Sequence, residues 1–152
     1  MLLVFGIISA CENDIKKVKT ITKLNNSAIR NGTDVTLIYS EKGTIKIKIK
    51  AKKMEEYVGK KHYIEMTKGI KVLFYNDNKK VSATLTAKYA IQRIDEKIIE
   101  AKNDVVVIND KGEQLNTEHL IWSQDSAKIY SNEFVKITTP DEIIMGEGFE
   151  AN

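Results

Sequence analysis

The chain has 152 residues, of which 42% are hydrophobic and 30% are charged, and its net charge is +3. These values exclude a largely disordered chain, and they fit one domain that is long enough to bury its own core. The charge is uneven, because residues 1–80 carry 17 basic and 8 acidic side chains (+9), whereas residues 81–152 carry 7 and 13 (−6). This asymmetry fits an acidic partner or head-to-tail stacking, and an incidental origin stays open.

The first ten residues, Met1–Ala10, are apolar and end in small side chains directly before Cys11. They are far fewer than the roughly 20 apolar residues that span a bilayer, so they predict an export signal and not a transmembrane helix. The segment Ile8-Ser9-Ala10-Cys11 resembles the lipobox of bacterial lipoproteins, in which the cysteine is acylated. We therefore predict a lipoprotein signal peptide over residues 1–11 with lipidation at Cys11, and an ordinary buried cysteine is the alternative.

Residues 12–31 are expected to form a tether between this anchor and a folded domain. From Asp14 to Asn31 the chain is polar and rich in lysine, and its scattered apolar residues follow neither the helical nor the strand period. A short helix in this stretch is left open. The folded domain is then expected over residues 32–152.

Residues 44–50 predict a half-buried strand, since isoleucine and lysine alternate strictly and so point to opposite faces of a sheet. The lysine stripe is interpreted as a solvated face and not as a nucleic-acid site, because no aromatic residues are interleaved with it. The single proline and the many Ile, Val and Thr residues favour an all-β fold. Further strands, separated by turn residues, are predicted over 35–40, 70–75, 81–91, 97–108, 114–122, 128–138 and 142–150.

Most of these strands share the pattern apolar-x-small-x-x-apolar, as in Leu85-Ala87-Ala90. The small residues at 87, 101, 117, 131 and 146 recur every 14 to 16 positions, which is the length of one strand with its turn. A small side chain lets a strand bend sharply, because a bulky one would clash inside the bend. The repeat thus predicts a folded-over sheet, and a plain β-sandwich is the alternative.

The chain also resembles the LptC family in segments that occur in order along nearly its whole length. These segments are Asp34–Ser40, Gly69–Tyr75, Thr84–Ala90, Leu115–Trp122, Val135–Glu142 and Gly146–Asn152. The resemblance implies a V-shaped, open, antiparallel β-jellyroll of repeated hairpin strands. Family members usually continue beyond a segment like the last one, which implies a shortened C-terminus.

The resemblance further implies a periplasmic protein of lipopolysaccharide transport that performs no chemistry and needs no cofactor. It would accept lipopolysaccharide from an inner-membrane ABC transporter (LptB, LptF and LptG) and pass it to an LptA-type bridge protein. With the lipobox, the expected location is the periplasm, anchored to the inner membrane as a lipoprotein. A structural lipoprotein that binds other proteins through its sheet edges is the alternative.

An apolar groove between the two halves of the bent sheet, here called the trough, would hold the lipid. Its candidate residues are apolar or small and alternate with polar neighbours: Leu85, Ala87, Ile99, Ala101, Leu115, Thr117, Ile129 and Ile144. If each bend carries a bulge, the faces swap after the small residue, so the side on which later residues lie stays open. Tyr89, Val105, Leu120, Trp122 and Phe134 are therefore left on either face, and of these Tyr89 and Phe134 are added to the trough candidates.

Catalytic and metal sites are not expected. The only histidines, His62 and His119, are far apart in sequence and accompany no second cysteine, which argues against zinc. Adjacent carboxylates such as Glu55-Glu56 and Asp141-Glu142 would point to opposite faces of a strand, so a polysaccharide hydrolase is a remote alternative.

Overall fold

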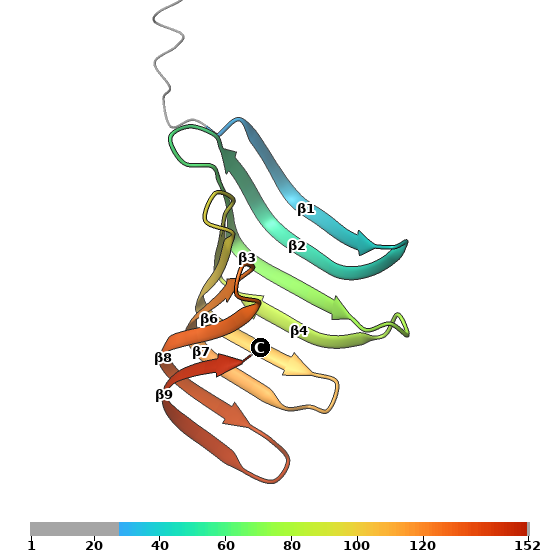
Figure 1. Cartoon of the computed structure of the whole chain (residues 1–152), viewed down its shortest axis with the longest axis vertical. Coiled ribbons are helices and arrows are strands. Elements are labelled where there is room, and N and C mark those ends of the chain that lie inside the picture. The colour runs from blue at the N-terminus through green and yellow to red at the C-terminus, as the bar shows by residue number, and fades with distance from the viewer. Residues whose placement is uncertain (1–27, 152) are drawn as a thin grey trace, which may run out of the picture.

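The computed structural model describes residues 28–151, and all regular structure in this range belongs to one antiparallel sheet of nine strands (Figure 1). The strands are β1 (Arg30–Glu41), β2 (Thr44–Tyr57), β3 (Tyr63–Tyr75), β4 (Val81–Ala87), β5 (Tyr89–Arg93), β6 (Ile98–Asn109), β7 (Gln114–Ser123), β8 (Lys128–Thr138) and β9 (Ile143–Ala151). No helix occurs in this range, so none there is long and apolar enough to cross a membrane.

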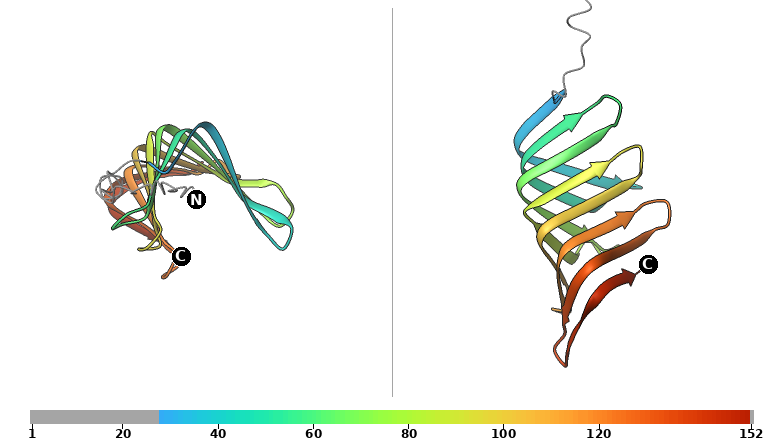
Figure 2. Two further views of the ribbon diagram at one scale, coloured as in Figure 1. Left: turned by 90° about the horizontal axis from the view of Figure 1, so that it is seen from above. Right: turned by 90° about the vertical axis from the view of Figure 1, so that its left-hand side faces the viewer.

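Consecutive strands pair through short turns, in the order β1-β2-β3-β4-β6-β7-β8-β9. Strand β5 continues β4 after Lys88, and it pairs with the other halves of β3 and β6. Seen from above, the strands stack behind one another and all bend at the same level, so the sheet folds over into a V-shaped channel (Figure 2). The predicted open, folded-over antiparallel β-jellyroll is confirmed.

The bend divides the sheet into two arms, here named the β4 arm and the β5 arm after the strand that lies wholly in each. Residues at the bend are polar, and several have positive φ, as Lys68 (63°), Asn103 (64°) and Asp104 (59°) do. The register shifts at this level in four strands: directly after a small residue in β2, β7 and β8, and one position after Ala101 in β6. The bends predicted after Ala101 and Thr117 are therefore confirmed.

Inward-facing residues on the two sides of the bend are not equally spaced in all strands. They are three positions apart in β7, between Thr117 and Leu120, and four apart in β6, between Ala101 and Val105. A spacing of three shifts the alternation of the strand by one residue. A spacing of four keeps the alternation of the strand. The residue midway between the two, such as Asn103, then faces outward, although alternation alone would place it on the inner face.

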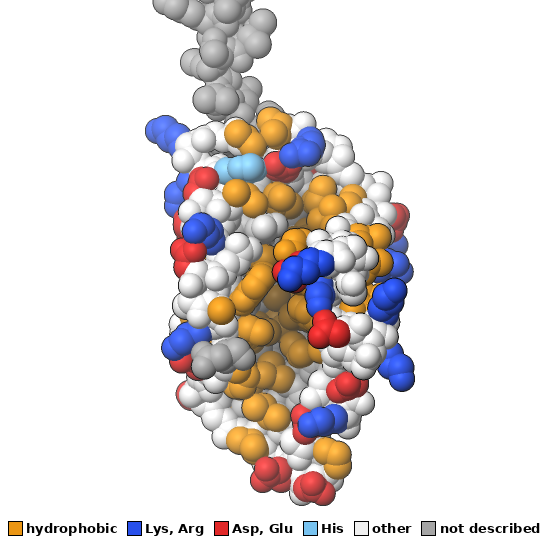
Figure 3. Space-filling view, turned by 45° about the vertical axis from the view of Figure 1, so that its right-hand side comes forward, with side chains coloured by type: hydrophobic (Ala, Val, Ile, Leu, Met, Phe, Trp, Pro, Cys, Tyr) orange, Lys and Arg blue, Asp and Glu red, His pale blue; other side chains and the backbone are white. Residues whose placement is uncertain are grey.

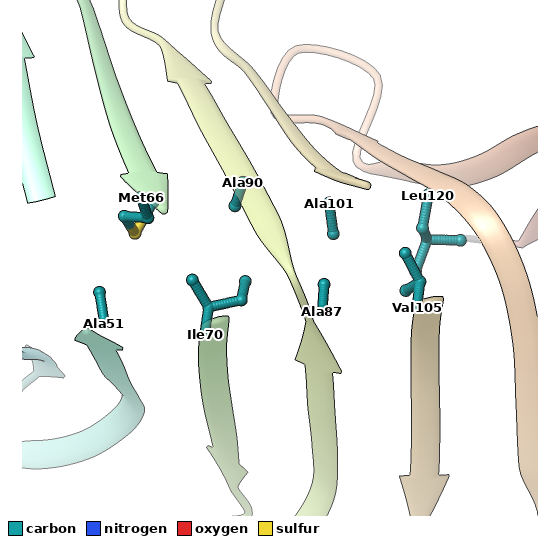
Figure 4. Packing of buried hydrophobic residues seen from close by; sticks show 8 residues of the cluster. All are labelled: Ala51, Met66, Ile70, Ala87, Ala90, Ala101, Val105 and Leu120. Atoms are coloured by element: carbon teal, nitrogen blue, oxygen red, sulfur yellow. The ribbon is translucent and has the colours of Figure 1, made fainter. Parts of the chain in front are cut away.

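The buried core consists of two cross-strand rows, one in each arm next to the bend (Figure 4). The β4 arm contributes Ala51, Ile70, Ala87 and Val105, and the β5 arm contributes Met66, Ala90, Ala101 and Leu120. Four of these eight residues are alanines, which is why the arms can approach so closely at the bend.

Several boundaries differ from those predicted. Strand β1 begins at Arg30, inside the predicted tether, and β2 and β3 extend well beyond residues 44–50 and 70–75 because they continue through the bend into the β5 arm. The single strand predicted over 81–91 is two strands, since Lys88 interrupts it at the bend. The predicted signal peptide, Cys11 and the tether up to residue 27, with its possible short helix, lie outside the described residues.

Candidate functional site

The inner faces of the two arms enclose an apolar cavity of about 380 Å³ that is open along one side. Figure 3 shows the corresponding band of hydrophobic side chains, which runs along the hollowed face between rims that carry charged groups. The β4 arm lines the cavity with Ile47, Ile49, Ile70, Val72, Phe74 and Leu85. The β5 arm lines it with Met66, Ala90, Ile99, Ala101, Leu120, Trp122 and Ile129. These thirteen residues define the trough from here on.

The continuity of the apolar lining follows from the strand register. Ile49 lies opposite Val72, Val72 opposite Leu85, Leu85 opposite Val107 and Val107 opposite Leu115, and all of these residues are apolar. Side chains that stand opposite each other on neighbouring strands are close enough to pack. The row is therefore a continuous hydrophobic surface along the β4 arm.

A polar cluster lies on the inner face of the β5 arm, at the β2 end of the sheet. Glu56 is buried, with its carboxylate 2.6 Å from Nε of Arg30 and 2.8 Å from Nε2 of His62. The hydrogen bonds from His62 and Arg30 lower the pKa of Glu56, so this carboxylate is charged at neutral pH. The apolar lining gives way here to a paired, ionised group.

Four of the predicted trough residues, Leu85, Ile99, Ala101 and Ile129, line the cavity. The structure places the other predicted residues around it. Ala87 is part of the buried core, and Leu115 packs against that core.

Thr117 and Ile144, also predicted for the trough, lie in the β4 arm, on β7 and β9 respectively. Thr117 is buried, with its hydroxyl 3.1 Å from that of Ser131. Ile144 continues the apolar row on β9, opposite Ile137, but it is 49% exposed. All eight of the trough candidates other than Tyr89 and Phe134 thus occupy the inner face, although only four line the cavity itself.

Tyr89 and Phe134 do not reach the trough. Tyr89 precedes Ala90, which does face the trough, and its hydroxyl donates a hydrogen bond to Glu65 at 2.8 Å on the outer face. Burial, and then this hydrogen bond, raises the pKa of the Tyr89 phenol. Phe134 alternates with the buried Val135 and is 50% exposed. The expectation that both face the trough is corrected. The bend turns Ala90 inward instead of Tyr89, and Val135 inward instead of Phe134.

Sequence reasoning missed several lining residues, most clearly Met66, Ile70 and Ala90. Met66 and Ile70 flank the segment Thr67-Lys68-Gly69, which hides the strand pattern by placing Lys68 where an apolar residue would stand. Their own sequence allows Leu120 and Trp122 on either face, and the three-residue spacing in β7 turns both inward.

A second charged cluster lies on the outer face of the β5 arm. The buried carboxylate of Glu100 is 2.7 Å from Nε of Arg93, 2.6 Å from Nζ of Lys102 and 3.0 Å from Nε2 of His119. Burial alone would raise the pKa of Glu100, but hydrogen bonds from Lys102, Arg93 and His119 outweigh it and hold the pKa at about 2. This cluster stabilises the sheet on the side opposite the trough.

The trough is suited to holding an apolar ligand. All thirteen lining residues have aliphatic, aromatic or thioether side chains. Among residues 28–151, no group of three His, Cys, Asp or Glu side chains is placed to hold a metal ion. An open, largely apolar groove is the expected form of a site for acyl chains.

Comparison with known proteins gives one family. The family model described as "Lipopolysaccharide-assembly, LptC-related" matches residues 2–152, which is almost the whole chain. A search of curated proteins finds no match.

Proposed function

The chain belongs to the LptC family, and from that premise we propose that it accepts lipopolysaccharide from an inner-membrane transporter and passes it to a bridge protein. Membership implies a role in lipopolysaccharide transport, in a family of periplasmic transport and binding proteins tied to the inner membrane. The donor in our proposal is the LptB, LptF and LptG transporter, and the acceptor is an LptA-type protein.

The observation that carries the proposal is the open apolar trough. An amphiphile with several acyl chains does not cross an aqueous compartment freely, because each exposed methylene costs about 0.8 kcal/mol. A groove that is apolar inside and open along one side covers the chains and leaves a polar head group in water. The structural alternative, a lipoprotein that binds only proteins, expects a filled interior, and the trough argues against it.

The two end strands support a hand-off to neighbouring proteins. Among residues 28–151, strands β1 and β9 each pair on one side only, so within this range each presents free main-chain groups along its other edge. An edge of this kind binds a further strand through main-chain hydrogen bonds with little demand on side chains. We therefore propose that the transporter and the bridge protein extend the sheet at its two ends.

Acylation of Cys11 would tie the protein to the inner membrane. The segment before it resembles a lipobox, and Cys11 is the only cysteine of the chain. Cys11→Ser is expected to move the protein from the membrane fraction to the soluble periplasmic fraction of cells. If the variant stays fully in the membrane fraction, the proposed anchor is wrong.

Photocrosslinking in cells that export lipopolysaccharide tests the carrier function. A photoreactive residue at Leu85 faces the trough, whereas one at Thr86 faces the outer side of the same strand. We expect lipopolysaccharide adducts at Leu85 and not at Thr86, and likewise at Ile99 but not at Ile98. Equal labelling of inner and outer positions, or none at the inner ones, would refute the proposal.

A further inference from the structure

Four hairpin turns lie at the end of the β4 arm that is away from the bend, and two of them differ from the others in charge and in exposed apolar side chains. These are the β1–β2 turn and the β3–β4 turn, which are adjacent because β2 pairs with β3 and which are joined by an ion pair between Lys46 and Asp77. In the left view of Figure 2 these two hairpins extend furthest from the bend. We refer to residues 38–48 and 75–81 together as the basic tips.

The basic tips carry an excess of positive charge, whereas the other two turns carry the opposite. Residues 38–48 and 75–81 include five lysines and two acidic residues, but residues 109–114 and 138–143 include one lysine and four acidic residues. Within the part of the chain that the structure describes, no ion pair is found for four of the five lysines, namely Lys42, Lys48, Lys79 and Lys80. The charge at the tips is therefore available to an anionic partner.

The basic tips also expose large apolar side chains on both faces of the sheet. Ile38 is 55% exposed on the outer face, while Tyr39 (60%) and Ile45 (42%) follow the inward alternation of the trough residue Ile47. Val81 at the second tip is 41% exposed. An antiparallel hairpin at a water-exposed edge ordinarily keeps at least one polar face. Apolar residues on both faces, surrounded by lysines, suit a tip that is immersed in an interface.

We propose that the basic tips adsorb to the surface of an anionic phospholipid bilayer. The lysines would contact lipid phosphates while Ile38, Tyr39 and Ile45 enter the boundary between head groups and acyl chains. Attraction of about 1 kcal/mol per lysine is typical at such surfaces, and tyrosine is enriched at that depth. This contact is separate from the anchor at Cys11 and from lipid in the trough, and it would hold the β1–β4 end of the trough against the membrane.

A single-cysteine probe tests this contact directly. Because Cys11 is the only cysteine, full-length Cys11→Ser is free of thiols and of acylation, and Tyr39→Cys in that background accepts a polarity-sensitive fluorophore at one basic tip. The matched control is Ile143→Cys at the acidic β8–β9 tip, where the native side chain is 56% exposed. Each labelled protein is mixed with vesicles of phosphatidylglycerol and phosphatidylethanolamine, or of phosphatidylcholine alone, at low and high salt.

We expect a blue-shifted, brighter signal from position 39 with the anionic vesicles only, lost at 0.5 M salt or so because the attraction is screened. The probe at position 143 should not respond. Adding Lys79→Gln and Lys80→Gln should weaken vesicle binding about 25-fold, at about fivefold per lysine, whereas Lys111→Gln should leave it within twofold.

The inference is overturned if positions 39 and 143 respond alike, if neutral vesicles give the same response, or if the double lysine variant binds as before. A response to lipopolysaccharide micelles but not to phospholipid vesicles would assign the basic tips to the cargo and would also overturn it. Far-UV circular dichroism checks that each variant is folded. Crosslinking at Leu85 reports the carrier function independently of this result.

Discussion

Glu100 is a buried carboxylate whose negative charge is stabilised by neighbouring side chains and not by water. Its pKa is about 2 in the folded protein against 4.5 ordinarily. The ionised carboxylate therefore stabilises the folded protein fully above pH 4.5, and this contribution is lost as the pH falls toward 2. We expect Glu100→Gln to lower the free energy of unfolding at pH 7 by about 2 kcal/mol, because it leaves Arg93 and Lys102 without a charged partner. The variant should also lose less stability than the wild type between pH 5 and pH 2.

Urea unfolding at several pH values measures both effects. Glu133→Gln is the matched control, since Glu133 is exposed at the bend. Equal acid sensitivity of wild type and Glu100→Gln would show that the cluster does not determine this pH dependence.

Gly69 allows β3 to turn through the bend. Its φ of +101° is strained for any side chain with a Cβ, and worst for a β-branched one. We expect Gly69→Val to reduce the free energy of unfolding by about 2 kcal/mol. Gly59→Val, in a turn with open space and no positive φ, should change it by less than about 0.5 kcal/mol. Similar losses of stability in both variants, measured by thermal unfolding, would contradict this role of Gly69.

Two lysines lie directly opposite each other on the neighbouring strands β2 and β3. Lys50 and Lys71 are cross-strand partners on the exposed outer face, and like charges in this position are destabilising. Lys71→Glu should raise the free energy of unfolding by about 0.5 kcal/mol at low salt, and the gain should vanish at about 1 M salt. Lys136→Glu, whose cross-strand neighbours are Asn116 and Met145, should give no comparable gain.

The sequence predicts a strand correctly wherever apolar and polar residues alternate without interruption, as in residues 44–50. The β5-arm halves of β2 and β3 could not, because the bend inserts polar residues such as Lys52 and Lys68 into an otherwise apolar series. The small residues before the bend were a usable signal, since only a small side chain fits on the inside of a sharp fold.

The candidate site was predictable up to the bend and ambiguous beyond it. Leu85 and Ala87 precede the bend and face inward as the alternation predicts. Beyond it, the spacing of three in β7 turns Leu120 inward, while the same spacing from β4 to β5 turns Ala90 inward and Tyr89 outward. Which spacing a strand adopts depends on the register of its neighbours, and the sequence of one strand does not contain that information.

Stability across the whole molecule is expected to fall from the centre of the stack to its ends. In the described part of the chain, strands β1 and β9 contain no buried residue and pair on one side only, whereas β6 contains three buried residues and pairs on both sides. Backbone amides of β6 and β7 should therefore exchange with deuterium slowest, and those of β1 and β9 fastest. Hydrogen–deuterium exchange resolved by strand measures this order, and uniform exchange along the stack would contradict it.

The trough leaves an apolar surface that, in a two-layered protein, a second sheet or a helix would cover. Acyl chains that fill it would become an exchangeable part of the core, so occupancy should raise the melting temperature with ligand concentration and increase the heat capacity of unfolding. The empty carrier would then be the least stable form of the protein. Supply of cargo would thereby set how well the folded chain resists proteolysis.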